Sequence, residues 1–89
     1  MGDIRFTIGT TPNPNSIRIG LSRAVFAKPT TYANAQAAAG DPLVKRLFTL
    51  PGVVQVFAMN DFLSINKDPA TDWSVLEPRI AQILMEHFA

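Results

Sequence analysis

Residues 4–21 read IRFTIGTTPNPNSIRIGL, in which two alternating apolar and polar runs flank a stretch rich in Pro and Asn. The apolar residues that share one face of each run are Ile4, Phe6 and Ile8, then Ile17, Ile19 and Leu21. Alternation with a period of two is typical of a half-buried strand. We therefore predict two strands that pair antiparallel.

The connection between these strands, TTPNPNS at residues 10–16, has two interpretations. Each Pro restricts the residue before it to extended conformations, and Asn13 and Asn15 can form turns with the nearby backbone. The stretch is either a stiff structural connection or a presented loop that touches a partner. Local chemistry leaves both interpretations open.

The middle of the chain predicts a helix and a hairpin. Residues 24–26 are apolar and suggest a small edge strand, followed by an extended loop, KPTTYAN. Asn34 is a candidate N-cap for the Ala-rich run 35–40, and Asp41 is a candidate N-cap for a helix over 42–50 with Pro42 in its first turn. Residues 53–58 and 62–66 are rich in β-branched and aromatic residues, which favours a hairpin around 59–61.

The last helix is predicted to follow Asp72, because apolar residues recur there at steps of three and four. Pro78 lies inside this run, and an interior Pro loses a backbone hydrogen bond. We expect either a kink near Ser74 or a helix that begins near Glu77. Trp73 either packs on the core or anchors an interface.

These elements predict an α+β fold in one domain spanning residues 1–89. We expect a two-layer sandwich in the order ββαββα, with an antiparallel sheet of four or five strands and two helices on one face. The opposite face of the sheet is then left for solvent or a partner. If Phe57 or Phe62 faces outward there, it marks an interaction surface.

Composition argues against several classes of function. With 8 basic and 7 acidic residues the formal net charge is +1, so we expect no nucleic-acid partner. No apolar run reaches the roughly 20 residues of a membrane span, and the first residues lack the pattern of a signal peptide. We therefore expect no membrane association and a cytoplasmic location.

Catalytic and metal-binding patterns are missing from the sequence. The chain has no cysteine, which rules out thiolate ligands for a metal or an iron-sulfur cluster. The one histidine, His87, has no nucleophile pattern to accompany it, and the acidic residues look like caps and turns. We predict that the chain is not an enzyme and has no catalytic, cofactor-binding or metal-binding residues and no cofactor.

Three stretches resemble the N-terminal domain of the Nfu/NifU-type iron-sulfur scaffold proteins. They are TPNPNSIRI, then AAAGDPLVKRLFTLPGVVQVFAMNDFLSINK, then DWSVLEPRIAQILMEHF, which together cover nearly the whole chain. In longer family members this domain precedes a second domain whose Cys-x-x-Cys pair holds the cluster. The chain stops where that domain would begin, so the resemblance implies the fold and an accessory role, and no cluster-holding residue.

The resemblance leads to a first hypothesis, a non-enzymatic interaction domain associated with iron-sulfur cluster assembly or delivery. Its partner would be a scaffold, a carrier or a client protein, met through Asn13, Asn15, Arg18 and Asp61 in the Pro-Asn loop and a neighbouring hairpin turn. The alternative is a general protein-interaction or regulatory module without an iron-sulfur role. The sequence leaves the identity of the partner and the oligomeric state open.

Overall fold

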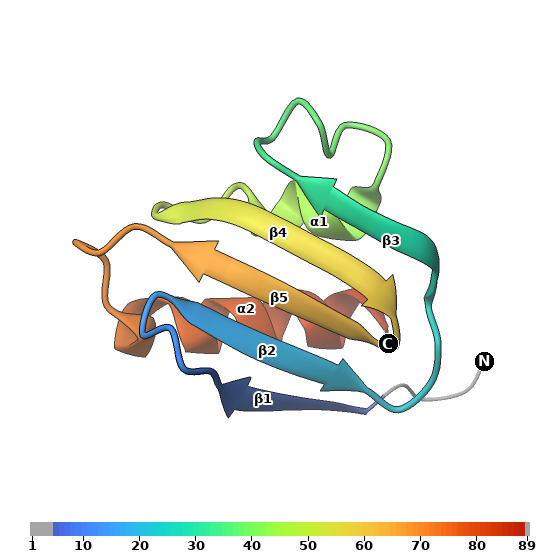
Figure 1. Ribbon diagram of the computed structural model, residues 1–89, viewed down its shortest axis with the longest axis horizontal. Helices are drawn as coiled ribbons and strands as arrows, with labels where there is room; N and C mark the ends of the chain where they lie inside the picture. The colour runs from blue at the N-terminus through green and yellow to red at the C-terminus, as the bar shows by residue number, and fades with distance from the viewer. Residues whose placement is uncertain (1–4, 89) are drawn as a thin grey trace.

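The computed structural model describes residues 5–88 and has a sheet layered on two helices (Figure 1). The elements, in chain order, are β1 (Phe6–Thr10), β2 (Ser16–Leu21), β3 (Phe26–Tyr32), α1 (Pro42–Leu47), β4 (Val53–Asn60), β5 (Phe62–Lys67) and α2 (Trp73–His87). The predicted α+β sandwich is confirmed, and the sheet has five strands. Ile4, where we expected the first strand to begin, lies outside the described residues.

The sheet is antiparallel throughout, with the strand order β1-β2-β5-β4-β3. The predicted pairing of the first two strands is confirmed, with Ile8 opposite Ile19. β2 also pairs with β5 from the far half of the chain, so that Ile19 lies opposite Leu63. The central strands therefore tie the two halves of the sequence together.

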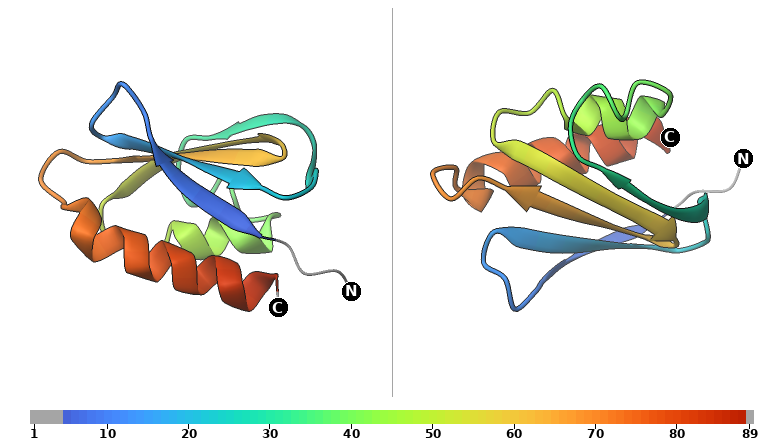
Figure 2. Two further views of the ribbon diagram at one scale, coloured as in Figure 1. Left: turned by 90° about the horizontal axis from the view of Figure 1, so that it is seen from below. Right: turned by 45° about the horizontal axis from the view of Figure 1, so that its top comes forward.

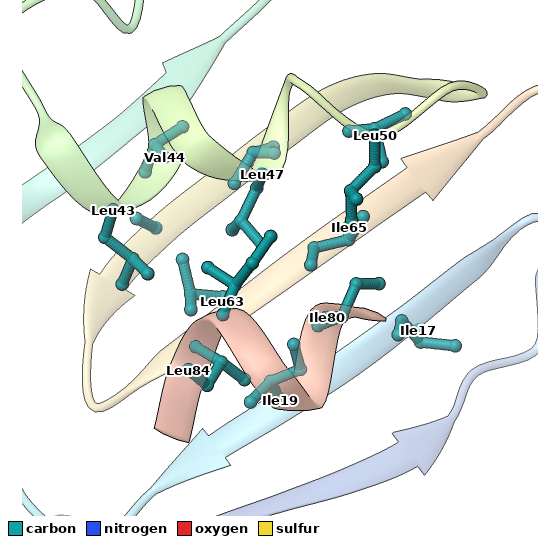
Figure 3. Close-up of a cluster of buried hydrophobic side chains, with 14 of the residues drawn as sticks. Ile17, Ile19, Leu43, Val44, Leu47, Leu50, Leu63, Ile65, Ile80 and Leu84 are labelled. Atoms are coloured by element: carbon teal, nitrogen blue, oxygen red, sulfur yellow. The ribbon is translucent and has the colours of Figure 1, made fainter. Parts of the chain in front are cut away.

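Both helices pack on the same face of the sheet, as the two views of Figure 2 show. The inward-facing side chains of β2, β4 and β5 meet the apolar faces of α1 and α2 (Figure 3). Ten large side chains of this core are almost completely buried: Ile19, Leu43, Val44, Leu47, Val56, Leu63, Ile65, Leu76, Ile80 and Leu84. Strand alternation places every second residue of the central strands on the other face, which no helix covers.

The two helices begin where the cap residues predict. Asp41 Oδ1 accepts hydrogen bonds from the backbone N–H groups of Leu43 and Val44, both at 3.1 Å, and Pro42 occupies the first turn. Asp72 Oδ1 accepts from the N–H of Ser74 at 2.8 Å. Side-chain caps of this kind satisfy N–H groups that have no partner inside the helix.

The region 24–40 differs from the prediction in two ways. The third strand, β3, contains the KPTTY stretch that we expected to be a loop; it tolerates Pro29 because it is an edge strand with an irregular register between Phe26 and Thr30. Asn34 accepts a hydrogen bond from the N–H of Ala37, but residues 34–40 form turns, not a helix. Only Ala38 of this run is buried, and so short a helix is unstable without packing.

The helix α1 and the hairpin are also tighter than predicted. α1 ends at Leu47, three residues early, and Phe48 caps it. β4 extends to Asn60, so that Asp61 alone separates it from β5. Asn60 has φ 48°, a left-handed conformation that Asn tolerates better than most residues.

The helix α2 begins at Trp73 and runs through Pro78, so the predicted start near Glu77 is wrong. The ring removes the hydrogen bond that a residue at this position would donate to the carbonyl group of Ser74. Burial of Leu76 and Ile80 on either side of Pro78 holds the helix on the sheet and offsets that loss.

Gly52 provides a test of how the connections at one end of the sheet fit together. Its φ of 98° disfavours any side chain, and a Cβ atom there would lie 2.8 Å from Cβ of Thr71. We predict that Gly52→Ala lowers the free energy of unfolding by roughly 2 kcal/mol or more, measured by urea denaturation. Gly40→Ala is the control, because Gly40 has open space around it. Equal losses of unfolding free energy in both variants would contradict the close approach of Gly52 to Thr71.

Asp72 predicts a pH dependence of stability. Its hydrogen bonds from Ser74 hold the pKa of the carboxyl group below its usual 3.8. The folded state therefore binds the proton less readily than the unfolded chain, so the stabilisation is complete above about pH 4 and is lost as the pH falls through the lowered pKa. Asp72→Asn, which keeps a capping oxygen, should flatten the decline in melting temperature below pH 4. A variant that declines as steeply as the parent would contradict this.

Candidate protein-interaction site

The Pro-Asn connection, called here the signature loop (residues 11–16), is built by its own polar groups. Asn13 Oδ1 accepts a hydrogen bond from the N–H of Asn15 at 2.9 Å, and Thr11 Oγ1 accepts from the N–H of Asn13 at 3.1 Å. The N–H of Ser16 donates to the carbonyl group of Asn13 at 3.0 Å. The side chains of Thr11 and Asn13 therefore fix the loop in one conformation.

The loop is also fastened to the start of α2 and the end of β5. Lys67 donates from Nζ to Asn15 Oδ1 at 3.1 Å and from its backbone N–H to the carbonyl group of Asn15 at 2.8 Å. Trp73 donates from Nε1 to the carbonyl group of Pro14 at 2.9 Å. We call the signature loop together with residues 67–73 the motif corner.

Lys67 is the buried charge of the motif corner, with only 8% of its surface exposed. Its ammonium group also donates to the carbonyl group of Asp68 at 3.2 Å and lies 5.5 Å from the centre of the Trp73 ring. No carboxylate forms an ion pair with it within residues 5–88, where the one ion pair joins Arg46 and Glu86. A buried ammonium group is costly without hydrogen bonds, so Asn15 is needed to satisfy it.

A second feature lies on the face of the sheet that the helices leave uncovered, called here the open face. Its residues on the three central strands are Ser16, Arg18, Gly20, Gln55, Phe57, Met59, Phe62, Ser64 and Asn66. The guanidinium carbon of Arg18 lies 4.1 Å from the centre of the Phe62 ring, and the rings of Phe62 and Phe57 are 5.9 Å apart. Both aromatic residues face outward and are partly exposed, where we expected one.

The predicted partner-binding residues do not form one cluster. Asn13 and Asn15 lie at one end of the sheet, where β2 begins. Asp61 lies at the opposite end, where its carbonyl group accepts a hydrogen bond from the N–H of Leu21 as β2 ends (Figure 1). Arg18 lies between them on the open face, so the expectation that the hairpin turn neighbours the loop is wrong.

The sequence interpretation missed Lys67. A signal for it exists, because Lys67 continues the inward-facing series of Leu63 and Ile65 in β5. A lysine at an inward position needs a partner, and that partner is Asn15, distant in the sequence. The alternation of apolar residues along β5 can reveal that a charged residue occupies an inward position, but only the fold reveals which residue it contacts.

The motif corner contains a depression in the protein surface. The depression is shallow and open, has a volume of about 280 Å³ and is lined by Lys67 and residues 69–73. In the described part of the chain no group of three or more His, Cys, Asp or Glu residues comes together. His87 is exposed at the end of α2, where its ring contacts Phe88.

None of the helices among residues 5–88 is long and apolar enough to cross a membrane.

A family model described as "Scaffold protein Nfu/NifU N terminal" matches residues 6–89. The chain belongs to this family. The match covers the signature loop, the open face and both helices, so the predicted resemblance is confirmed. The Thr-Pro-Asn-Pro-Asn stretch of this Nfu N-terminal domain is therefore the sequence of a loop whose polar groups determine its shape.

Relatives of this Nfu N-terminal domain are similarly named. "NFU1 iron-sulfur cluster scaffold homolog, mitochondrial" of Drosophila persimilis is 37% identical over 81 residues, which is 89% of this chain and 29% of the relative. The protein of the same name from Drosophila ananassae is 36% identical over 81 residues, and 28% of it is covered. The chain thus spans less than a third of the relatives' length.

Solved structures share the fold of this Nfu N-terminal domain. A NifU-like protein from Saccharomyces cerevisiae superimposes with a TM-score of 0.82 at 26% identity, over 94% of this chain and 77% of that one. The protein SeR13 from Staphylococcus epidermidis gives a TM-score of 0.66 at 35% identity, over 91% and 94% of the two chains. The same two-layer arrangement therefore occurs in an experimentally determined NifU-like protein.

The contact of Trp73 with the signature loop can be tested by Trp73→Phe. This change keeps an aromatic ring but removes the hydrogen bond to the carbonyl group of Pro14. We predict a loss of about 1 kcal/mol in the free energy of unfolding. Amide hydrogen exchange at Asn15 and Ser16, measured by NMR, should become faster because the loop loses an anchor.

The matched control is Tyr32→Phe, which removes the hydrogen bond from the Tyr32 hydroxyl group to Asp41 Oδ2. That bond lies away from the signature loop, so exchange at Asn15 and Ser16 should stay at the wild-type rate. Faster exchange in both variants, or in neither, would show that Trp73 does not hold the loop.

Proposed function

We propose that this chain is a non-enzymatic interaction domain in iron-sulfur cluster assembly or delivery, and that it binds a scaffold, carrier or client protein. Membership of the Nfu/NifU N-terminal family and the names of the relatives support an association with iron-sulfur cluster assembly. The lack of cysteine supports a role beside the cluster-holding group, not as its thiolate ligand. The named relatives are mitochondrial, and a cytoplasmic location for this chain stays a prediction.

The observation that carries the proposal is the way the signature loop is held. Its inner groups are fixed by Lys67 and Trp73, while Pro12, Asn13 and Pro14 are exposed. Asn13 uses its Oδ1 atom inside the loop, and its NH2 group has no acceptor within residues 5–88. A preorganised, exposed donor loses little conformational entropy when it binds a partner.

The four predicted residues fit a partner that lies along the open face. Asn13 and Asn15 precede β2 at one end of that face, Arg18 lies within β2, and Asp61 lies beside the other end of β2. A standard protein interface buries roughly 800 Å² on each side. The domain measures 38 × 25 × 23 Å, so an interface of that size reaches along much of the sheet.

A general protein-interaction module without an iron-sulfur role remains the alternative. The open face supports this function equally well, because its aromatic residues and Arg18 would suit many partners. Binding to a Cys-x-x-Cys scaffold domain separates the two, since only the first proposal requires it.

We predict that adding an Nfu-type Cys-x-x-Cys domain to the ¹⁵N-labelled chain shifts the NMR signals of the signature loop and of β2. The variant Asn13→Asp should weaken binding about tenfold, because it replaces the exposed NH2 donor but keeps the oxygen that shapes the loop. Affinity is measured from the same titration.

The control variant is Asn34→Asp, which makes the same chemical change in the 34–40 turns. Asn34 Oδ1 also accepts a backbone hydrogen bond, from Ala37 at 2.8 Å. Binding by this variant should match the parent. No shifts with the scaffold domain would exclude it as the partner, and equal weakening by both variants would remove Asn13 from the interface.

A further inference from the structure

The open face has a charged centre with no partner of its own. The guanidinium group of Arg18 lies over the ring of Phe62, and in the part of the chain that the structure describes it forms no ion pair. A guanidinium group beside an aromatic ring keeps N–H donors that can bind a carboxylate through two hydrogen bonds. Arg18 is exposed, so those donors reach solvent.

The surroundings of Arg18 leave room for a second molecule. Gly20 lies opposite Phe62 in the sheet, and a Cβ atom built on Gly20 would meet nothing within 4 Å. Arg18 itself lies between two small residues in the sheet, with Gly9 of β1 opposite it on one side and Ser64 of β5 opposite it on the other. The rings of Phe57 and Phe62 therefore border a part of the sheet where the side chains are small.

Acidic residues are confined to the later part of the described chain, where they are mixed with Lys45, Arg46, Lys67 and Arg79, and Arg18 is the charge on the central strands of the open face. Residues 5–40, which supply β1, β2 and β3, contain Arg5, Arg18, Arg23 and Lys28 and no acidic residue. Most acidic residues of the described chain cap or belong to the helices or precede α2: Asp41, Asp68, Asp72, Glu77 and Glu86. Asp61, in the β4–β5 turn, lies at the end of the sheet.

We propose that the open face binds an acidic segment of a partner protein in which a carboxylate is flanked by apolar side chains. The carboxylate pairs with Arg18, and an apolar side chain occupies the space above Gly20 against Phe62. The inference rests on the proposed function, that the domain acts by binding a protein, and adds where and with what chemistry. Charge complementarity selects the acidic partner, and the aromatic rings supply the contact area.

Two other occupants fit the face less well. Nucleic acid is bound through several phosphate contacts at once, and Arg18 is the only charged residue at the open-face positions of β2, β4 and β5. A symmetric pair of this chain would bring the same patch of each copy together, with like charges facing each other. An acidic protein segment suits the single cation and its aromatic neighbours.

The test is an NMR titration of the ¹⁵N-labelled chain with two short capped peptides. One alternates Glu with Leu and Phe, and the other has Lys in place of every Glu. The acidic peptide should shift the amide signals of Arg18, Phe57, Phe62 and Ser64 and should bind several-fold more weakly when salt rises from about 50 to about 200 mM. The Lys peptide should leave these signals in place.

Two variants locate the site, each checked for an intact fold by its spectrum. Arg18→Glu should lower the affinity for the acidic peptide at least about tenfold. Gly20→Val should also lower that affinity, because the new side chain fills the space beside Phe62. The matched control is Arg79→Glu, the same charge change at an exposed position of α2, and its affinity should stay within about twofold of the parent.

Several results would overturn the inference. The acidic peptide could fail to shift the open-face signals, or the Lys peptide could shift them equally. Arg18→Glu and Arg79→Glu could also weaken binding of the acidic peptide to the same extent. Tighter binding of a single-stranded RNA at the same residues, or concentration-dependent shifts there without peptide, would assign the face to nucleic acid or to a second copy. If the peptide binds as predicted but the Cys-x-x-Cys domain does not bind, the iron-sulfur partner fails and the acidic-segment site stands.

Discussion

The inward-facing side chains of β2, β4 and β5 are buried against α1 and α2, and those two helices lie on the same side of the sheet. Burying a side chain such as Ile65 or Leu63 contributes about 1.5–3 kcal/mol, so this layer accounts for most of the stability of so small a domain. With both helices committed to one face, β2, β4 and β5 expose the other. The aromatic residues and Arg18 on that face are therefore available to a partner.

The motif corner is where the buried layer ends. Lys67 continues the inward series of β5, but at this position the core gives way to the start of α2, and an ammonium group can be satisfied there by Asn15 and the Trp73 ring. The same contacts hold the signature loop beside the end of the sheet. The Pro and Asn residues of this loop thus have a structural role, and Asn13 also has an exposed NH2 group, for which we propose a role in recognition.

The layer architecture could be predicted from sequence because its signals are local. The alternation around Ile17 and Ile19 and the caps at Asp41 and Asp72 each depend on neighbouring residues. The predictions for β3 and for residues 34–40 were wrong. The structure of β3 depends on its edge position and that of residues 34–40 on their lack of burial, and neither property is local. The separation of Asp61 from Asn15 depends on β2 pairing with β5, which alternation does not specify.

The central claim is that a partner lies on the open face and not on the helices. Cross-saturation NMR on the complex with an Nfu-type Cys-x-x-Cys domain tests this directly, because saturation passes only across atoms in contact. The account predicts the strongest transfer at Arg18, Phe57, Phe62 and Ser64 and little at the outer surface of α2, such as Val75 and Met85. Strong transfer at Val75 and Met85 with none at Arg18 would contradict it.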